Sequence, residues 1–171
     1  MDVSMASLQI PMKRPPNPAR GFTLIEMVVV VLIVGILASA AMPLAALHKR
    51  RSQEAELRLS LRTLRMAIDE HKRAWDAGRI EKKVDASGYP PNLDVLVQGV
   101  IDVGSPTGQR IYFLRRLPRD PFADAQLPAA QTWATRSYAS PPEAPAPGAD
   151  VFDVASRAAG VGLDGVPYRQ W

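Results

Sequence analysis

The stretch RGFTLIEM, residues 20–27, separates two very different parts of the chain. Before it lies a charged, proline-rich segment, whereas residues 28–47 after it carry no charge. The apolar run that begins at Phe22 therefore contains a single acidic residue, Glu26. A carboxylate costs roughly 2.5–3.5 kcal/mol at the centre of a bilayer, so an acid in such a segment marks a functional site. The alternative is that Glu26 lies at the headgroup boundary, where it costs little.

The apolar run is long enough to cross a membrane. Residues 27–47, at about 1.5 Å each, extend about 31 Å as a helix, and the hydrocarbon core is about 30 Å thick. The competing interpretation is an ordinary signal peptide cut after Ala38-Ser39-Ala40. Against it, the apolar run continues to Leu47, and Pro43 falls just beyond that cut. The sequence favours a transmembrane helix.

These residues resemble the processing and methylation motif of type IV pilins and type II secretion pseudopilins. Gly21 precedes the cleavage site of the motif and Phe22 follows it. Glu26 takes the fifth position of the mature chain, and Pro43 the twenty-second. The resemblance implies cleavage between Gly21 and Phe22 by a prepilin peptidase, followed by N-methylation of Phe22.

The spacing of Phe22 and Glu26 permits a charge pair. Residues four apart lie one turn from each other on a helix face, and cleavage leaves a cationic amine on Phe22. That amine can neutralise Glu26 within one subunit or between neighbours, and the resemblance implies the pairing between subunits. Gly35 and Pro43 are the weak points of this helix. We expect a kink or local opening near Pro43, because proline cannot donate a helical hydrogen bond.

Composition narrows the choice within this superfamily. The 171 residues include no cysteine, whereas type IV pilins commonly close a carboxyl-terminal loop with a disulfide, so the resemblance favours pseudopilins. The formal net charge is only +4, without a concentrated basic face, and we do not expect nucleic-acid binding. Basic residues flank the span on both sides, so charge does not settle its orientation.

We expect four segments along the chain. They are a cleaved leader (1–21), a transmembrane and assembly helix (22–47), an amphipathic continuation of that helix (48–78) and a periplasmic, β-containing globular domain (79–171). The continuation has one apolar stripe with helical spacing, and Gly78 is its predicted stop. The stripe comprises Leu57, Leu61, Leu64, Ile68, His71 and Trp75. We expect charged residues to occupy the remaining surface, with ion pairs Glu54–Arg58 and Asp69–Arg73.

The predicted fold class is α+β, pilin-like, with the long helix packed on a small antiparallel sheet. A short helix is expected at 92–97 with Asn92 as its cap, and three strands at 110–117, 132–139 and 151–156. A Leu-Pro-Arg-Asp-Pro corner at 117–121 resembles the major pseudopilin. We expect the large aromatic residues of this domain to lie in its core. They are Trp75, Trp133 and Phe152.

The carboxyl-terminal segment contains Gly-x-Gly-x-x-Gly at 160–165. It is not a dinucleotide fingerprint, because no βαβ unit surrounds it, and its glycines suit a tight loop instead. In the major pseudopilin the matching loop binds calcium. Calcium needs six to eight oxygen ligands, and this loop offers little beyond Asp164. The sequence therefore leaves calcium open as a ligand and makes no cofactor certain.

The resemblance implies a non-enzymatic, structural subunit of the type II secretion pseudopilus, most like the major subunit. Its expected partners are other copies of itself, other pseudopilins, the prepilin peptidase, the inner-membrane assembly platform and membrane lipid. Its expected location is the inner membrane, with the carboxyl-terminal domain in the periplasm. The alternatives are a type IV or competence-type pilin, a secreted protein behind an ordinary signal peptide, and a membrane-anchored signalling module.

Overall fold

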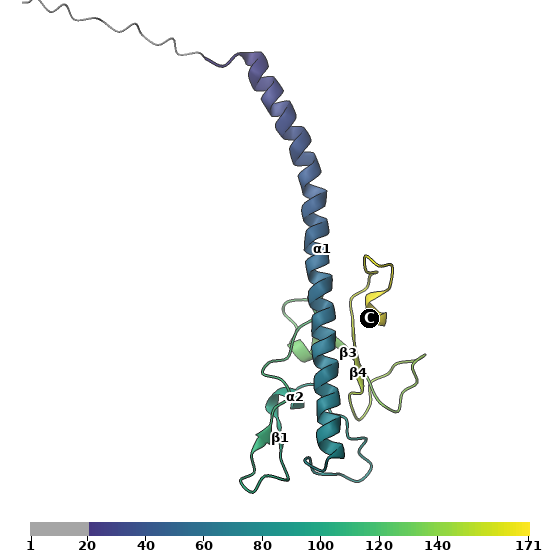
Figure 1. Cartoon of the computed structure of the whole chain (residues 1–171). Coiled ribbons are helices and arrows are strands. Elements are labelled where there is room, and N and C mark those ends of the chain that lie inside the picture. The colour runs from purple at the N-terminus through teal and green to yellow at the C-terminus, as the bar shows by residue number, and fades with distance from the viewer. Residues whose placement is uncertain (1–20) are drawn as a thin grey trace, which may run out of the picture. The chain divides into compact units, whose positions relative to one another are not determined.

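The computed structural model describes residues 21–171 (Figure 1). The predicted leader, apart from Gly21, lies outside the described residues. Two compact units are distinguished, Met1–Leu44 and Ala45–Trp171, and each is described by itself.

The helix α1, Leu24–Asp76, supplies the described structure of the first unit and the largest element of the second. It ends where the sequence predicts. Gly78 has φ +72°, its N–H donates to the carbonyl of Trp75, and the N–H of Arg79 donates to that of Ala74. This pair of bonds is a glycine-dependent helix cap, because a residue with a Cβ is strained at that φ.

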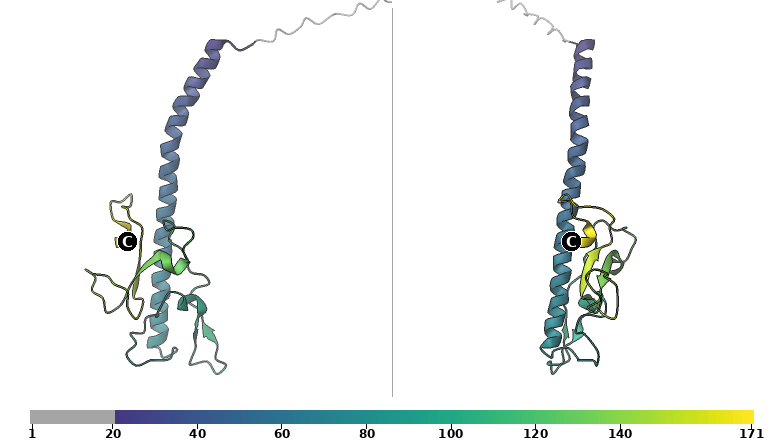
Figure 2. Two further views of the ribbon diagram at one scale, coloured as in Figure 1. Left: turned by 180° about the vertical axis from the view of Figure 1, so that it is seen from behind. Right: turned by 90° about the vertical axis from the view of Figure 1, so that its right-hand side faces the viewer.

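In the second unit, α1 provides the floor of the hydrophobic core. Leu57, Leu61, Leu64 and Ile68 are each at most 2% exposed, and His71 is 4% exposed. Residues after 79 gather on one side of this part of α1 (Figure 2, right). The predicted apolar stripe is confirmed over these five positions, because helical periodicity fixes which face turns toward the rest of the domain.

Two small antiparallel sheets complete the second unit. The strand β3, Trp133–Arg136, pairs with β4, Asp153–Ser156, in a register that places Trp133 opposite Ser156. The strand β1, Val100–Ile101, pairs with β2, Arg110–Ile111. The α+β class with a long amino-terminal helix is confirmed, and the single three-stranded sheet is wrong.

The segment 110–117 explains the difference. Only Arg110 and Ile111 form a strand, and their partner is β1, which lies between the predicted helix at 92–97 and this segment, where no strand is predicted. The next residues follow a different course, because the N–H groups of Phe113 and Leu114 both donate to the carbonyl of Leu96. The backbone after Ile111 is therefore held against α2, Val95–Gln98, instead of extending the sheet.

The short helix α2 confirms the helix predicted at 92–97, displaced by a few residues toward the carboxyl end. The side-chain oxygen of Asn92 accepts a hydrogen bond from the N–H of Val95 at 3.1 Å, so Asn92 satisfies a free donor at the start of α2.

The predicted corner at 117–121 is anchored to the β3–β4 sheet. The indole N–H of Trp133 donates to the carbonyl of Pro118 at 3.0 Å. The carboxylate of Asp120, 2% exposed, accepts bonds from the N–H of Phe122 and the hydroxyl of Ser156. The 3-10 helix η1, Ala129–Thr132, directly precedes β3, and the 3-10 helix η2, Tyr168–Gln170, follows β4. A buried acid is stabilised here by donors from two separate segments.

The three aromatic residues predicted for the core have different environments. Trp133 is fully buried, as predicted. Trp75 and Phe152 are only half-buried, and each has a cation over its ring: Lys82 lies 4.8 Å from Trp75, and Arg136 lies 4.6 Å from Phe152. For these two, the prediction of a core position is wrong, because cations and solvent cover one side.

The stripe on α1 generates a direct test of the core. Leu64→Ala should lower the free energy of unfolding by about 2–5 kcal/mol, because it removes a fully buried side chain and leaves a cavity. Leu59→Ala, on the same helix at a position 64% exposed, should change it by less than about 0.5 kcal/mol. Denaturant unfolding of the detergent-solubilised chain, followed by tryptophan fluorescence, measures both. Equal losses in the two variants would contradict the described packing.

Candidate functional site

The start of α1 holds the lone acid of the apolar segment. The hydroxyl oxygen of Thr23 accepts a hydrogen bond from the N–H of Glu26 at 3.3 Å, and the carbonyl of Thr23 accepts from Met27. Thr23 therefore caps the helix, and Glu26 lies in its first turn. A carboxylate is stabilised there by the positive end of the helix dipole.

The residues on either side of the predicted cleavage point precede α1. Gly21 and Phe22 are not helical, and the side chain of Phe22 is 73% exposed. The sequence predicts a helix from Phe22, and α1 begins two residues later because Thr23 takes the capping position. Glu26 is likewise exposed in the single chain. A second molecule can therefore reach the side chains of both Phe22 and Glu26.

The surface of α1 that follows is apolar on every side. Leu24 is 82% exposed, Leu37 65% and Met42 76%, and the intervening valines and isoleucines are also exposed. The segment is long and apolar enough to cross a membrane by length and composition. A helix that is apolar all round requires lipid or other helices to cover it. The site that this unit offers is therefore a helix surface with one charge at its end.

Gly35 and Pro43 both lie inside α1. A Cβ added to Gly35 would meet nothing within 4 Å in the single chain. The helix is assigned without interruption through Pro43, so the expected local opening does not break it here.

Asp164 is the one residue that the sequence suggests as a metal ligand, and its surroundings do not fit calcium. One carboxylate oxygen accepts from the Arg58 guanidinium at 2.6 Å, and the other from the N–H of Val166 at 3.0 Å. Residues 21–171 contain no group of three histidine, cysteine or acidic side chains placed to hold a metal. A bound divalent cation would have to displace a guanidinium that already neutralises the only acid of the loop.

The charged side chains of α1 are arranged differently from the sequence prediction. Glu54, expected on the surface beside Arg58, is 4% exposed and pairs instead with Arg50 at 3.3 Å. Its carboxylate also accepts hydrogen bonds from the N–H of Leu163 and the hydroxyl of Tyr168. Arg73 pairs with Glu70 rather than with Asp69. Distant donors decide the position of Glu54, and a helical pattern contains no information about them.

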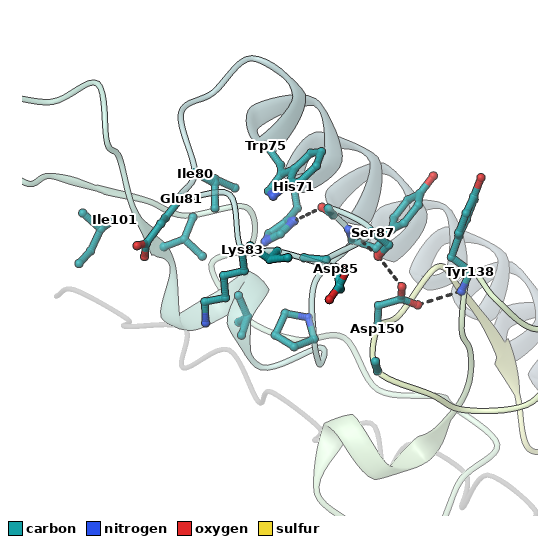
Figure 3. Close-up of a pocket in the computed structure, with 18 of the residues that line it drawn as sticks. His71, Trp75, Ile80, Glu81, Lys83, Asp85, Ser87, Ile101, Tyr138 and Asp150 are labelled. Atoms are coloured by element: carbon teal, nitrogen blue, oxygen red, sulfur yellow. Dashed lines mark hydrogen bonds between the residues drawn. The ribbon is translucent and has the colours of Figure 1, made fainter.

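A second feature is an open pocket of about 1510 Å³ near the end of α1 (Figure 3). Asp150 links two segments that line this pocket. Its carboxylate accepts hydrogen bonds from the hydroxyl of Ser87 on one segment, and from the N–H of Tyr138 and the hydroxyl of Ser137 on the other. Burial alone would raise the pKa of Asp150. The three hydrogen bonds outweigh burial and hold that pKa below its usual value.

His71 lies at the base of the same pocket. Its Nδ1 is 3.0 Å from the carbonyl of Gly88, and its ring lies 5.2 Å from that of Phe113. Burial lowers the pKa of His71, and the bond to Gly88 only partly opposes this effect. His71 is thus buried as a member of the predicted stripe on α1. The hydrogen bonds of Asp150 and His71 in this pocket hold loops in place, which is a structural role.

Comparison with known proteins identifies the class of protein to which the amino-terminal segment belongs. The prokaryotic N-terminal methylation motif matches residues 16–42. This match includes Gly21, Phe22, Glu26 and Gly35 and ends just before Pro43. The chain is thus a protein with a prepilin-type amino terminus.

The relatives extend the likeness beyond this motif. The type II secretion system core protein G of Klebsiella michiganensis is 33% identical over 113 residues, which are 63% of this chain and 72% of that protein. The Klebsiella pneumoniae protein of the same name is also 33% identical, covering 63% of this chain and 73% of its own length. That of Aeromonas hydrophila is 31% identical over 108 residues, 61% and 68% of the two chains. The chain belongs to the type II secretion system core protein G family, the major pseudopilins. No solved structure gives a significant match.

Two parts of this site were missed in the sequence. Thr23-x-x-Glu26 is the spacing of a helix capping box, and this signal alone predicts a start at Leu24. The burial of Glu54 had no local signal, because its donors Leu163 and Tyr168 lie more than 100 residues away.

The buried histidine predicts a pH dependence of stability. Because the folded pKa of His71 lies below its unfolded value of 6.5, the unfolded chain binds the proton more readily. The free energy of unfolding should therefore fall as the pH drops below 6.5 toward the folded pKa. His71→Gln should reduce this fall, whereas His48→Gln should retain it, because His48 is exposed. Denaturant unfolding at pH 7.5 and 5.5 makes the comparison, and an unchanged fall in His71→Gln would contradict the assignment.

Proposed function

We propose that the chain is a structural subunit of the body of a type II secretion pseudopilus, with a mechanical rather than a catalytic role. The observation that carries the proposal is an apolar helix surface, exposed all round, that bears Glu26 as its single charge. Membership of the core protein G family supports the same conclusion.

Processing is the first step that we propose. A prepilin peptidase cuts between Gly21 and Phe22, and the new amine on Phe22 is N-methylated while keeping its charge. The exposure of Phe22 ahead of the capped helix supports access by the modifying enzyme. Residues 1–21 are then the cleaved leader, and residues 22–47 are the transmembrane and assembly helix.

The second step that we propose is the anchoring of the processed chain in the membrane. The apolar helix is held in the inner membrane in a single pass, with residues 79–171 in the periplasm and the amphipathic segment 48–78 extending the helix into that domain. A helix with exposed apolar residues on every side is stable in lipid, where its backbone groups are satisfied internally.

Assembly replaces lipid around the helix by other helices. Copies of this chain and other pseudopilins bundle through the apolar surface, and an inner-membrane assembly platform adds them to the growing filament. Gly35 allows close approach of a neighbouring helix, since it has no side chain and the space where a Cβ would lie is open in the single chain. The filament then pushes exported proteins across the outer membrane.

The charge pair between the Phe22 amine and Glu26 of a neighbour specifies the register of this bundle. In the single chain Glu26 is exposed and lies at a helix start, where it is tolerated. Within a bundle it would be buried, and a buried charge requires a partner of opposite sign. A correctly placed neighbour supplies that partner through its Phe22 amine.

Substitutions of Glu26 test the proposal. Glu26→Gln should insert into the membrane as well as the wild type, because it removes the cost of an intramembrane charge. It should abolish filament assembly, because loss of one partner from a buried pair costs about 3–5 kcal/mol. Alkaline extraction of membranes measures insertion, and recovery of sheared filaments from overproducing cells measures assembly.

Glu26→Asp is the matched control, since it keeps the charge on a shorter side chain and should retain part of the assembly. Normal filament yield from Glu26→Gln would remove the charge pair from the mechanism. Loss of membrane insertion in that variant would instead contradict the proposed role of the apolar surface.

A further inference from the structure

Four charged side chains of α1 contact the carboxyl-terminal residues of the chain, and three of them reach the loop at residues 160–166. Arg50, Glu54, Arg58 and Arg65 follow one another at spacings of four, four and seven residues, which places them along one face of the helix. All four reach residues between 153 and 171. Together with their partners we call this arrangement the α1 clamp.

Glu54 is the buried centre of the clamp. One of its carboxylate oxygens accepts from the N–H of Leu163 at 3.0 Å and from the hydroxyl of Tyr168 at 2.9 Å. Arg50 lies 3.3 Å from the same oxygen and also donates to the carbonyl of Val161. A carboxylate that is 4% exposed is thereby satisfied by two donors and one cation.

Arg58 neutralises the acid at the tip of the loop. Its guanidinium donates to Asp164 at 2.6 Å and lies 4.3 Å from the centre of the Trp171 ring. Arg65 extends the clamp, donating to the backbone oxygens of Trp171 at 2.6 Å and Val154 at 3.0 Å. Trp171 is therefore held both at its ring and at its backbone.

The loop itself closes tightly around these contacts. The N–H of Gly162 donates to the carbonyl of Val166 at 2.8 Å, and the N–H of Gly165 donates to the carbonyl of Gly162. A Cβ on Gly162 would clash with the Trp171 ring, so only glycine permits this approach. The loop packs directly on the residues that α1 holds.

The side-chain oxygens of the loop's own acid, and one of its backbone carbonyls, already have partners. Both oxygens of Asp164 accept hydrogen bonds, and the carbonyl of Val161 accepts from Arg50. Glu54, an acid of α1 that contacts the loop, already accepts from Leu163 and Tyr168. Calcium needs six to eight oxygens, and the two guanidinium groups beside the loop oppose a divalent cation electrostatically.

We propose that this loop is ordered by the α1 clamp in place of a metal ion, with the Arg58 guanidinium acting as the resident cation of the loop. The domain then folds and keeps its carboxyl-terminal segment docked without calcium. The inference concerns the folded chain alone and does not depend on filament assembly, so it can fail while the proposed function stands.

Hydrogen exchange of the detergent-solubilised full chain tests the proposal. In the wild type, amides of residues 160–168 should exchange at the same rate in millimolar calcium and in excess chelator. Arg58→Ala should speed that exchange by about 1.5- to 5-fold, the factor that corresponds to a half-exposed ion pair. Calcium should not reverse the change. Raising the salt concentration should speed exchange in the wild type more than in Arg58→Ala, because salt screens an ionic contact.

Arg62→Ala is the matched control. Arg62 lies one turn further along α1, is exposed, and takes part in no ion pair within residues 21–171. It should leave exchange at 160–168 unchanged. A double-mutant cycle with Asp164→Ala adds a second readout, since Arg58→Ala should have little further effect once Asp164 is removed.

Three results would overturn the proposal. The first is slower exchange of the wild-type loop in calcium than in chelator, which would show that a metal orders it. The second is an unchanged rate in Arg58→Ala, which would show that the guanidinium does not. Equal effects of Arg58→Ala and Arg62→Ala would also contradict the specific role of Arg58.

Discussion

The structure depends on one constraint: α1 must be stable in two different surroundings. Up to residue 47 its surface is apolar on every side and exposed, and Glu26 is its single charge. From Glu54 onward, one face is buried by residues that follow the helix in the chain, and most of the exposed positions are charged, Leu59 and Met66 being the large apolar exceptions. A helix segment that is apolar on every side must be covered by lipid or by other helices. A segment with one apolar stripe needs only the domain that packs on that stripe. The helix therefore supplies both the surface for association and the core for folding.

The face of α1 that organises the domain carries more than apolar residues. The core contains the leucines of this face, Leu57, Leu61 and Leu64. The buried Glu54, on the same face, accepts hydrogen bonds from Leu163 and Tyr168 of the carboxyl-terminal segment. Contacts made by a buried carboxylate are directional, so they fix one position of the segment where apolar packing alone allows several. In a domain without cysteine, such contacts supply an attachment that a disulfide supplies elsewhere.

Much of this arrangement could be predicted from the sequence, and the reason differs from element to element. The apolar segment and the stripe at Leu57, Leu61 and Leu64 follow from periodicity, which is a local property. The stop at Gly78 follows from the conformational freedom of one residue. The paired strands β1 and β2 have two residues each, and no pattern can be read from so few positions.

The candidate site shows the same division. Gly21, Phe22 and Glu26 belong to a contiguous motif, and the methylation motif matches the region that contains them. The assignment of Asp164 to a metal rests on the composition of its loop alone. Its actual partner, Arg58, is 106 residues away in the sequence. Long-range contacts of charged residues are the part of the structure that single-sequence reasoning did not reach.

The most direct test of the account is the amino-terminal residue and intact mass of the mature protein extracted from membranes. We predict a chain that begins at Phe22 and carries one methyl group on its terminal amine. The helix cap at Thr23 leaves Phe22 outside the helix, and the charge of Glu26 attracts a cationic terminal amine. A soluble protein beginning at Ala41 would contradict the account, because ordinary signal-peptide cleavage removes Glu26 and the whole apolar surface on which assembly depends.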